Sequence, residues 1–398
     1  MERAPLTILL ASPAYWPARA FGGPVVAARE LVRRLVDRGH QVDVLTTTLV
    51  DLHRRPAVRG RAEIVDGATV RYLATPVSYR WMGYTPTLTL ALQRLGRPDV
   101  AHVFGFRDPV TTIAALWCRA RGIPYVFEPL GMFRPRLRKV RVKRGFDATV
   151  ARGVASHAAS VVVASELERD DMLAGGIAPE RVVVRGNGFP EPPVGDDPSA
   201  AARAAAGVPA GAPLVLSVGR IAAGKGIEHL VATARALPEA HVVLVGPDDR
   251  HGATALVEAA RSDPATAGRV HALPATDGPP WDLYRSADVF VLASAGESFG
   301  LVAAAAAAVG TPVVVTDRCG VAGAFREGEA LVVPYEGDAV AAAVRRVLGD
   351  AALRARLAEG AREAARRSSW EHVTDVQEEV YRRASARTAT TKSSTLGS

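Results

Sequence analysis

Segments typical of buried strands alternate with segments typical of amphipathic helices along almost the whole chain. Parallel sheets covered by helices are built from such alternating units. The first strand, LTILLAS at residues 6–12, is almost wholly apolar, as expected for a strand buried on both faces. The helix after it has apolar residues at helical spacing, at Ala28, Leu31, Val32 and Leu35. The pattern predicts an α/β fold with doubly wound sheets.

The alternation is interrupted once, by the proline-rich segment FPEPPVGDDP at residues 189–198. This composition is typical of an exposed hinge linker. Because 398 residues are too many for one ordinary core, we expect two similar Rossmann-like domains, residues 1–188 and 199–369. We expect residues 370–385 to form a helix that packs back on the N-terminal domain, and residues 386–398 to be a disordered tail.

Composition excludes several classes of protein. The longest apolar runs are far shorter than the roughly 20 residues that span a membrane, and no basic region precedes the short apolar segment at the N-terminus. We therefore expect a cytoplasmic protein. The two cysteines, Cys118 and Cys319, lack metal-ligand spacing, and neither an Asp-x-Asp pair nor a GxGxxG fingerprint occurs. No metal and no cofactor are expected.

The net charge of +8 comes mostly from arginines scattered over helical segments, so we expect no nucleic-acid partner. One segment is denser in cations, with Leu137, Val140 and Val142 interleaved. Its basic residues are Arg134, Arg136, Arg138, Lys139, Arg141, Lys143 and Arg144. Each cation near an anionic leaflet contributes about 1 kcal/mol. Residues 134–144 are therefore predicted either to contact the inner membrane face peripherally or to form a solvated helix or phosphate-facing loop.

The loop SVGRIAAGKGIEHL follows the first strand of the second domain, and open α/β sheets bind ligands where their strands end. Gly219, Gly224 and Gly226 let the backbone approach a ligand closely. Arg220 and Lys225 add two cations just before a helix N-terminus, which itself favours anions. The loop predicts a diphosphate site, the alternative being an ordinary glycine-rich turn with surface cations. It is not a Walker loop, because glycine follows Lys225.

A second candidate loop, ESFGL, follows the strand DVFVLAS and leads into a helix of alanines. The free amides of this helix start would face the same cleft as the glycine-rich loop. Glu297 cannot bind a phosphate, but it can accept hydrogen bonds from sugar hydroxyls. The alternative is that Glu297 caps the helix.

With these motifs, the chain resembles the retaining glycosyltransferases of the two-domain GT-B fold, in glycosyltransferase family 4. The resemblance covers nearly the whole chain and rests on short motifs in a specific order. They are FGGP, DVAHVFG, ASELE, RGNG, GRIAAGKG, VGPD, and ADVFVLASAGESFGLV followed by GTPVVVTDRCG. The resemblance implies two domains that face each other across a cleft and a nucleoside-diphosphate sugar as donor substrate.

The resemblance also implies roles for individual residues. Arg220 and Lys225 would hold the donor diphosphate, and Glu297 would contact the donor sugar. Gly22 and Gly23 would approach the phosphates from the N-terminal domain. The remaining donor-binding positions would be Gly219, Gly246, Leu273, Ser298, Phe299, Gly300 and Leu301.

The sequence departs from the family pattern in three places: at Ala305, at Leu130, and at His102, Val103 and Phe104, where the family frequently has His-x-His. A second glutamate, which contacts the nucleotide ribose, is replaced by Ala305; losing such a charge-assisted hydrogen bond weakens binding about 10- to 100-fold. A histidine near the reacting sugar is replaced by Leu130. Glu128, on the same face of its strand, either partly replaces this histidine as a catalytic group or is a buried partner of an arginine. His102 is expected to be a core residue.

The resemblance implies transfer of a sugar to an acceptor hydroxyl of a glycan, a lipid-linked glycan or a small molecule, with retention of configuration. Closure about residues 189–198 would exclude water. Ala305 and Leu130 leave a second hypothesis open, a catalytically weak subunit that binds a nucleotide or glycan. A sugar-nucleotide epimerase on the same fold fits the motifs less well.

Overall fold

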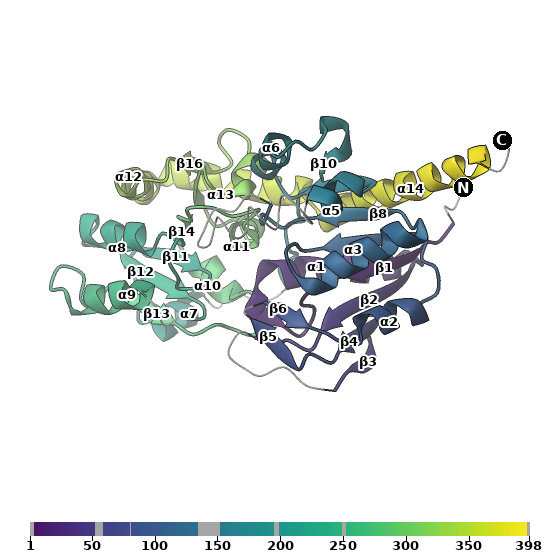
Figure 1. Ribbon diagram of the computed structural model, residues 1–398. Coiled ribbons are helices and arrows are strands. Elements are labelled where there is room, and N and C mark those ends of the chain that lie inside the picture. Colours follow the sequence, from purple (N-terminus) through teal and green to yellow (C-terminus); the bar gives the residue numbers. More distant parts are fainter. Residues whose placement is uncertain are drawn as a thin grey trace. The chain divides into compact units, whose positions relative to one another are not determined.

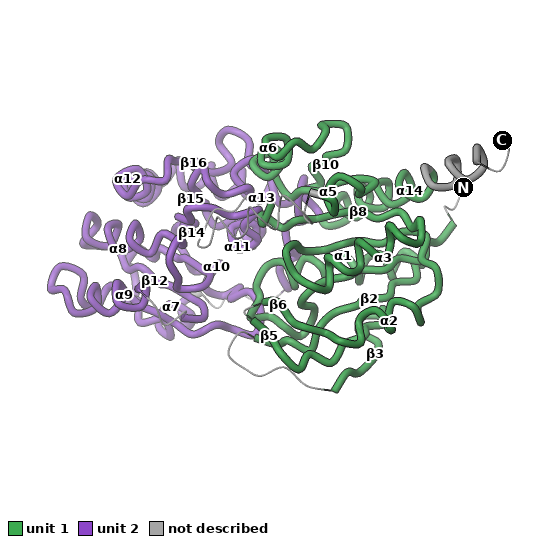
Figure 2. Tube along the Cα trace, viewed as in Figure 1, with its two compact units in different colours: residues 1–185, 370–398 green, residues 186–369 purple. Residues whose placement is uncertain are grey.

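The computed structural model describes residues 4–51, 59–79, 81–133, 152–194, 199–248 and 252–395. The chain divides into two compact units, one of residues 1–185 with 370–398 and the other of residues 186–369 (Figure 2). We call them unit 1 and unit 2. The basic segment 134–144 lies outside the described residues. Within the described part of the chain, no helix combines the length and apolar character needed to cross a membrane.

Unit 1 is built on an eight-stranded sheet with the order β10-β9-β8-β7-β1-β2-β4-β3. The strands are β1 Thr7–Ala11, β2 Gln41–Thr47, β3 Arg61–Val65, β4 Ala68–Leu73, β7 Val100–Phe104, β8 Tyr125–Glu128, β9 Ser160–Val163 and β10 Val182–Val184. All neighbours are parallel except β3, which pairs antiparallel with β4. Since β2 and β7 lie on opposite sides of β1, the loops after β1 and β7 diverge, and ligands of open sheets bind at such points.

Helices cover both faces of this sheet (Figure 1). Those of unit 1 are α1 Gly23–Asp37, α2 Leu88–Arg94, α3 Pro109–Arg121, α5 Arg152–His157, α6 Glu166–Ala174 and α14 Trp370–Thr395, with 3-10 turns η1 Arg19–Phe21 and η3 Pro179–Arg181. The apolar stripe of α1 is buried as its spacing predicts, including Leu31 and Leu35. A small hairpin, β5 Val77–Tyr79 with β6 Met82–Tyr84, completes the unit.

Unit 2 has a six-stranded, entirely parallel sheet with the order β13-β12-β11-β14-β15-β16. Its strands are β11 Leu214–Val218, β12 His241–Val245, β13 Val270–Leu273, β14 Val289–Leu292, β15 Val313–Thr316 and β16 Leu331–Val333. Its helices are α7 Ser199–Ala205, α8 Ile227–Ala236, α9 Gly252–Ser262, α10 Trp281–Ser286, α11 Leu301–Ala308, α12 Gly337–Gly349 and α13 Ala351–Arg367, with the 3-10 turn η4 Gly320–Ala324. The winding reverses between β11 and β14. The predicted α/β fold of two doubly wound domains is confirmed.

The segment expected as a linker differs from the expectation at its start. Phe189 is only 3% exposed, and its ring packs edge-on against Phe299 and Phe325. Its N–H donates to the carbonyl of Ser368. The segment that begins at Gly186 therefore belongs to unit 2, because its aromatic residue is anchored there.

The C-terminal helix is longer than expected, since α14 continues to Thr395 through residues predicted to be a disordered tail. Small and polar side chains do not favour burial, but they do not break a helix either. Up to Ala384, α14 packs on α1, β7 and β8 of the same unit, through buried residues that include Trp370, Val380 and Tyr381.

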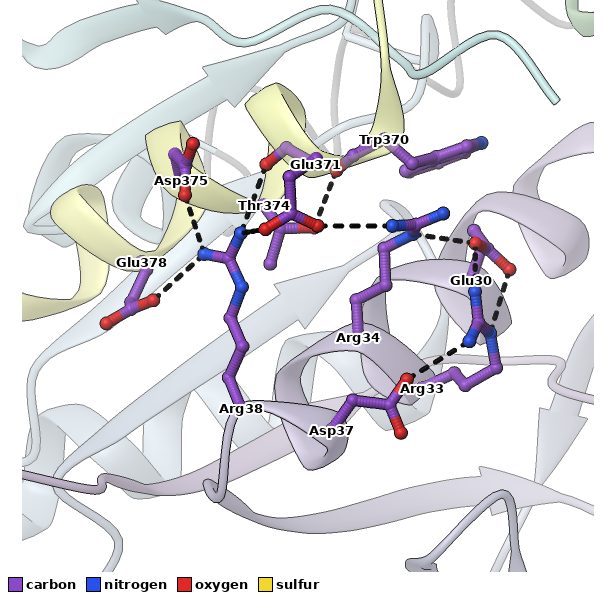
Figure 3. A network of polar contacts seen from close by, with 10 residues as sticks. All are labelled: Glu30, Arg33, Arg34, Asp37, Arg38, Trp370, Glu371, Thr374, Asp375 and Glu378. Carbon is purple, nitrogen blue, oxygen red and sulfur yellow. Dashed lines mark hydrogen bonds and ion pairs between the residues drawn. The ribbon is translucent and has the colours of Figure 1, made fainter. Parts of the chain in front are cut away.

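An ion-pair network joins α14 to α1 (Figure 3). The Arg38 guanidinium lies 2.8 Å from an Asp375 carboxylate oxygen and 3.1 Å from a Glu378 oxygen, and it also pairs with Glu371. Arg34 reaches Glu371 at 3.3 Å. Because several charges interact within one network, we expect it to stabilise the fold more than isolated surface ion pairs would.

Replacing Arg38 with alanine should lower the free energy of unfolding by about 1–2 kcal/mol at low salt, and by less at high salt, because Debye screening weakens partly exposed pairs. Urea unfolding at two salt concentrations measures this difference. Arg33→Ala is the matched control, since its ion pairs with Glu30 and Asp37 stay within α1. An equal effect of both substitutions, or one independent of salt, would contradict an anchoring role for Arg38.

Candidate functional site

Two loops of unit 2, residues 219–226 after β11 and residues 293–300 after β14, lie side by side at the point where the winding reverses. The N–H of Ala295 donates to the carbonyl of Gly224 at 2.9 Å, which joins the loops directly. The structure therefore brings the glycine-rich loop and the ESFGL loop together at the carboxyl ends of neighbouring strands, where a ligand of this sheet would bind.

The charged groups of these loops meet in an ion pair between Lys225 Nζ and Glu297 Oε1. Both side chains are partly exposed, at 26% and 21%. Ser294 Oγ donates to the same oxygen of Glu297 at 3.1 Å. Arg220 lies in the same loop as Lys225 and is exposed to solvent. Two cations and one carboxylate thus lie on these loops, and partial burial strengthens the interactions of Lys225 and Glu297 relative to bulk water.

Two of the glycines have a packing role. A Cβ on Gly226, which has a φ of +70°, would lie 1.9 Å from the carbonyl oxygen of Ala293. A Cβ on Gly246 would lie 2.0 Å from the carbonyl oxygen of Gly219. Backbone packing therefore explains glycine at both positions without a ligand. Gly219 has open space around its own Cβ position. Leu273 ends the neighbouring strand, and its carbonyl accepts from Gly246 N–H at 3.0 Å.

The start of α11 offers backbone groups rather than side chains. Its N-cap is Gly300, which has a φ of +118°, and no side chain caps the helix start with a hydrogen bond. Glu297 does not cap the helix, because its carboxylate bonds Lys225 and Ser294. Phe299 is 4% exposed, its ring packs on Phe189, and its carbonyl accepts from the Val321 N–H at 2.8 Å. Ser298 precedes it in the same loop. The first amides of the helix, from Leu301 on, carry the positive end of the helix dipole.

Ala305 lies within a run of five buried alanines, residues 303–307 of α11, and is 3% exposed. Helix α11 packs against α13, whose buried face includes Gly360, Ala361 and Ala364. Small residues on both helices allow their axes to approach closely. The alanine run thus has a packing explanation.

In unit 1, Gly22 and Gly23 begin α1 after the loop that follows β1. Gly22 has a φ of +78°, and a Cβ there would contact nothing within 4 Å. Nearby in the chain, two guanidinium groups lie over the Trp16 ring, with Arg29 3.8 Å and Arg19 4.1 Å from its centre. Such stacks are stabilised by the ring quadrupole. Pattern analysis of the sequence missed this cluster, because no spacing identifies it.

Glu128 takes the second of its two proposed roles, that of a buried partner of an arginine. It is 1% exposed, and its two oxygens accept from Arg185 at 2.8 and 2.9 Å. Burial raises the pKa of Glu128, but Arg185 and His102 outweigh that effect, so its pKa lies below the ordinary value. His102 is a fully buried core residue, as expected, and hydrogen-bonds the Tyr381 hydroxyl at 2.7 Å. The structure gives no support to a catalytic role for Glu128.

Leu130 lies in a tight turn whose two central residues have positive φ, +56° for Leu130 and +74° for Gly131. The N–H of Met132 closes the turn on the Pro129 carbonyl at 3.0 Å. A leucine in this left-handed region is strained by roughly 1–2 kcal/mol. The turn is held by Glu168, which accepts from the N–H of Gly131.

Glu168 is a further residue that the sequence did not single out. It is 3% exposed, and its other oxygen accepts from the Ala164 N–H at 2.9 Å. Burial raises the pKa of Glu168 to about 7, against the lowering effect of these two N–H groups. It is the last residue of the ASELE motif, which contains the capping pattern Ser-x-x-Glu, and Ser165 Oγ accepts from the Glu168 N–H at 3.3 Å.

Because the folded-state pKa of Glu168 exceeds its ordinary value of 4.5, its contribution to stability is complete below pH 4.5 and is lost as the pH rises through 7. The loss amounts to about 3 kcal/mol. Glu168→Gln should remove this part of the pH dependence of the unfolding free energy between pH 4.5 and 8. Glu166→Gln, on the exposed side of the same helix, is the control. A difference between wild type and Glu168→Gln that stays constant with pH would refute the assignment.

The fold and these two loops define a class of protein, the GT-B glycosyltransferases. Two family models match: "Glycosyl transferase 4-like domain" over residues 22–188 and "Glycosyl transferases group 1" over residues 199–364. A D-inositol 3-phosphate glycosyltransferase 1 from Catenulispora acidiphila is 31% identical over 407 residues, 95% of this chain and 94% of the relative. The chain therefore belongs to glycosyltransferase family 4 and is a glycosyltransferase.

Solved structures share the fold at lower identity. Sucrose-phosphate synthase from Thermosynechococcus elongatus has a TM-score of 0.76 and 24% identity, with 96% of this chain and 100% of that chain covered. HepE from Anabaena, solved in complex with UDP and glucose, has a TM-score of 0.73 and 19% identity, with 94% of this chain and 98% of that chain covered. Over the residues that the structure describes, no group of three or more His, Cys, Asp and Glu side chains is arranged to hold a metal ion.

Proposed function

We propose that the protein transfers a sugar from a nucleoside-diphosphate sugar to an acceptor hydroxyl, with retention of configuration and without a metal. The contact between Lys225 and Glu297, on adjacent loops of unit 2, carries the proposal, because it joins a group suited to phosphate with a group suited to sugar hydroxyls. The crystallised complex of HepE with UDP and glucose supports a nucleotide-sugar donor. The name of the Catenulispora relative makes an inositol phosphate the first acceptor to test.

The chemistry proposed for this site is mainly electrostatic. Negative charge builds on the leaving diphosphate, and Arg220, Lys225 and the first amides of α11 stabilise it. Glu297 orients the donor sugar through its hydroxyls, which keeps the reacting carbon in place. The acceptor is proposed to bind unit 1 by the loop of Gly22 and Gly23.

Arg220→Ala and Lys225→Ala should each weaken nucleoside diphosphate binding about 10-fold or more, since each removes a charge-assisted contact. Calorimetry with UDP, GDP and ADP measures binding, and release of nucleoside diphosphate from a panel of nucleotide sugars, with and without an inositol phosphate, measures turnover. The anomeric configuration of the product tests retention. Arg235→Ala is the control, because Arg235 lies on α8 and pairs with Asp263 on the surface.

The outcomes separate the hypotheses. Release that depends on Arg220 and Lys225 supports the transferase. Nucleotide binding without release identifies the catalytically weak binding subunit. If no nucleotide sugar releases its diphosphate and both substitutions leave binding unchanged, the proposed site is wrong.

We further propose that the enzyme works in the cytoplasm and contacts the inner membrane face through residues 134–144. The motivation is the dense positive charge of this segment. Vesicles with anionic lipid should retain the protein at low salt, and neutralising Arg138, Lys139 and Arg141 together should reduce retention about 10-fold or more. Equal sedimentation of both forms would leave the segment as ordinary surface. Vesicles of neutral lipid are the control.

A further inference from the structure

The two oxygens of the Glu297 carboxylate differ in their contacts. Oε1 receives both Lys225 Nζ and Ser294 Oγ. Within the described part of the chain, no group bonds Oε2. A carboxylate held through one oxygen presents the other in a defined direction, and that second oxygen is available to accept a hydrogen bond from a ligand.

Ser294 is firmly supported. It is 0% exposed and lies two residues after Leu292, the last residue of β14. Its carbonyl accepts from Thr316 Oγ1, at the end of the neighbouring strand, at 2.8 Å. Two further bonds fix Glu297 to the next loop, from its N–H to the Arg318 carbonyl and from the Gly320 N–H to its own carbonyl, both at 3.1 Å. The serine hydroxyl thus reaches Glu297 from a rigid base.

The two donors to Oε1 are not equivalent. Lys225 is a cation on a long, flexible side chain, so a bound diphosphate would compete with Glu297 for its ammonium group. Ser294 is neutral and buried, and an anionic ligand has no comparable pull on it. If Lys225 left Glu297 for a diphosphate, the bond from the Ser294 hydroxyl to Oε1 would remain.

We propose that Ser294 is a positioning residue for Glu297: it keeps Oε1 in place while Oε2 accepts a hydroxyl of the donor sugar. This inference rests on the proposed function, because it assumes that the ligand of this site is a nucleotide sugar. It adds a neutral residue of the loop after β14 to the cations and the carboxylate already described.

Ser294→Ala should lower kcat for nucleoside diphosphate release about 10- to 100-fold, the value of one hydrogen bond to a charged group. Its Kd for UDP should stay within about 2-fold, because Arg220 and Lys225 remain. On a Glu297→Ala background, Ser294→Ala should cost nothing further, since its partner is gone. Ser286→Ala is the matched control: it removes another buried serine hydroxyl of unit 2, which bonds the Asp282 carbonyl on α10.

Multiplicative effects of Ser294→Ala and Glu297→Ala, an unchanged kcat, or an equal loss in Ser286→Ala would overturn the proposal. If the wild type binds UDP-glucose without turnover, the ratio of the Kd values for UDP-glucose and UDP reports the sugar contact, and Ser294→Ala should change it in the same manner as Glu297→Ala. If the two substitutions change this ratio differently, the positioning role of Ser294 is rejected, while the proposed function still stands. A wild type that binds neither ligand rejects the proposed function and this inference together.

Discussion

Each unit depends on one constraint, the placement of its first strand inside a parallel sheet. A parallel connection must cross over the sheet through a helix, so a chain that begins in the middle has to wind outward on both sides. In unit 1 this strand is β1, and in unit 2 it is β11. The backbone bonds of these strands are satisfied on both sides, which leaves the loops at their carboxyl ends as the places where side chains are free to bind ligands.

Buried charge serves the architecture of unit 1 rather than its chemistry. Arg185 is bonded by Glu128 and by Gln377 of α14, at 2.8 Å each from Nη1, and it is the last residue before the chain enters unit 2. Removing such charges from water is costly, and only complete pairing offsets the cost. The network joins three segments of unit 1: strand β8, residue 185 where the chain leaves for unit 2, and helix α14, which begins where the chain comes back from unit 2. This explains why the Glu128 carboxylate, on the strand that precedes Leu130, has no free oxygen for a substrate.

Much of the fold was predictable because it follows from local pattern. Apolar runs identify β1 and β14, helical spacing identifies α1, and the two loops after β11 and β14 follow from glycine and charge next to strand ends. The pairings were not predictable in the same way. Glu128 meets Arg185 over a separation of 57 residues, and Glu168 reaches a turn 37 residues away. Phe189 lies among prolines that suggest a linker, yet its burial depends on two rings far along the chain. Such contacts are set by the tertiary structure, and single-sequence patterns carry no trace of them.

In unit 2, the loops carry the charged side chains and helix α11 carries the alanines, so an alanine run and a charged site lie next to each other. Every charged group of the candidate site lies on a loop after a strand, and Lys225 and Glu297 are both partly exposed. Helix α11 contributes its first amides and a face that packs on α13, and neither function needs a polar side chain at Ala305. Alanine also has the highest intrinsic helix propensity, so the alanine run stabilises helix α11, which begins directly after the ESFG loop. An alanine at position 305 therefore leaves in place the three groups to which we assign the proposed electrostatic role, Arg220, Lys225 and the first amides of α11.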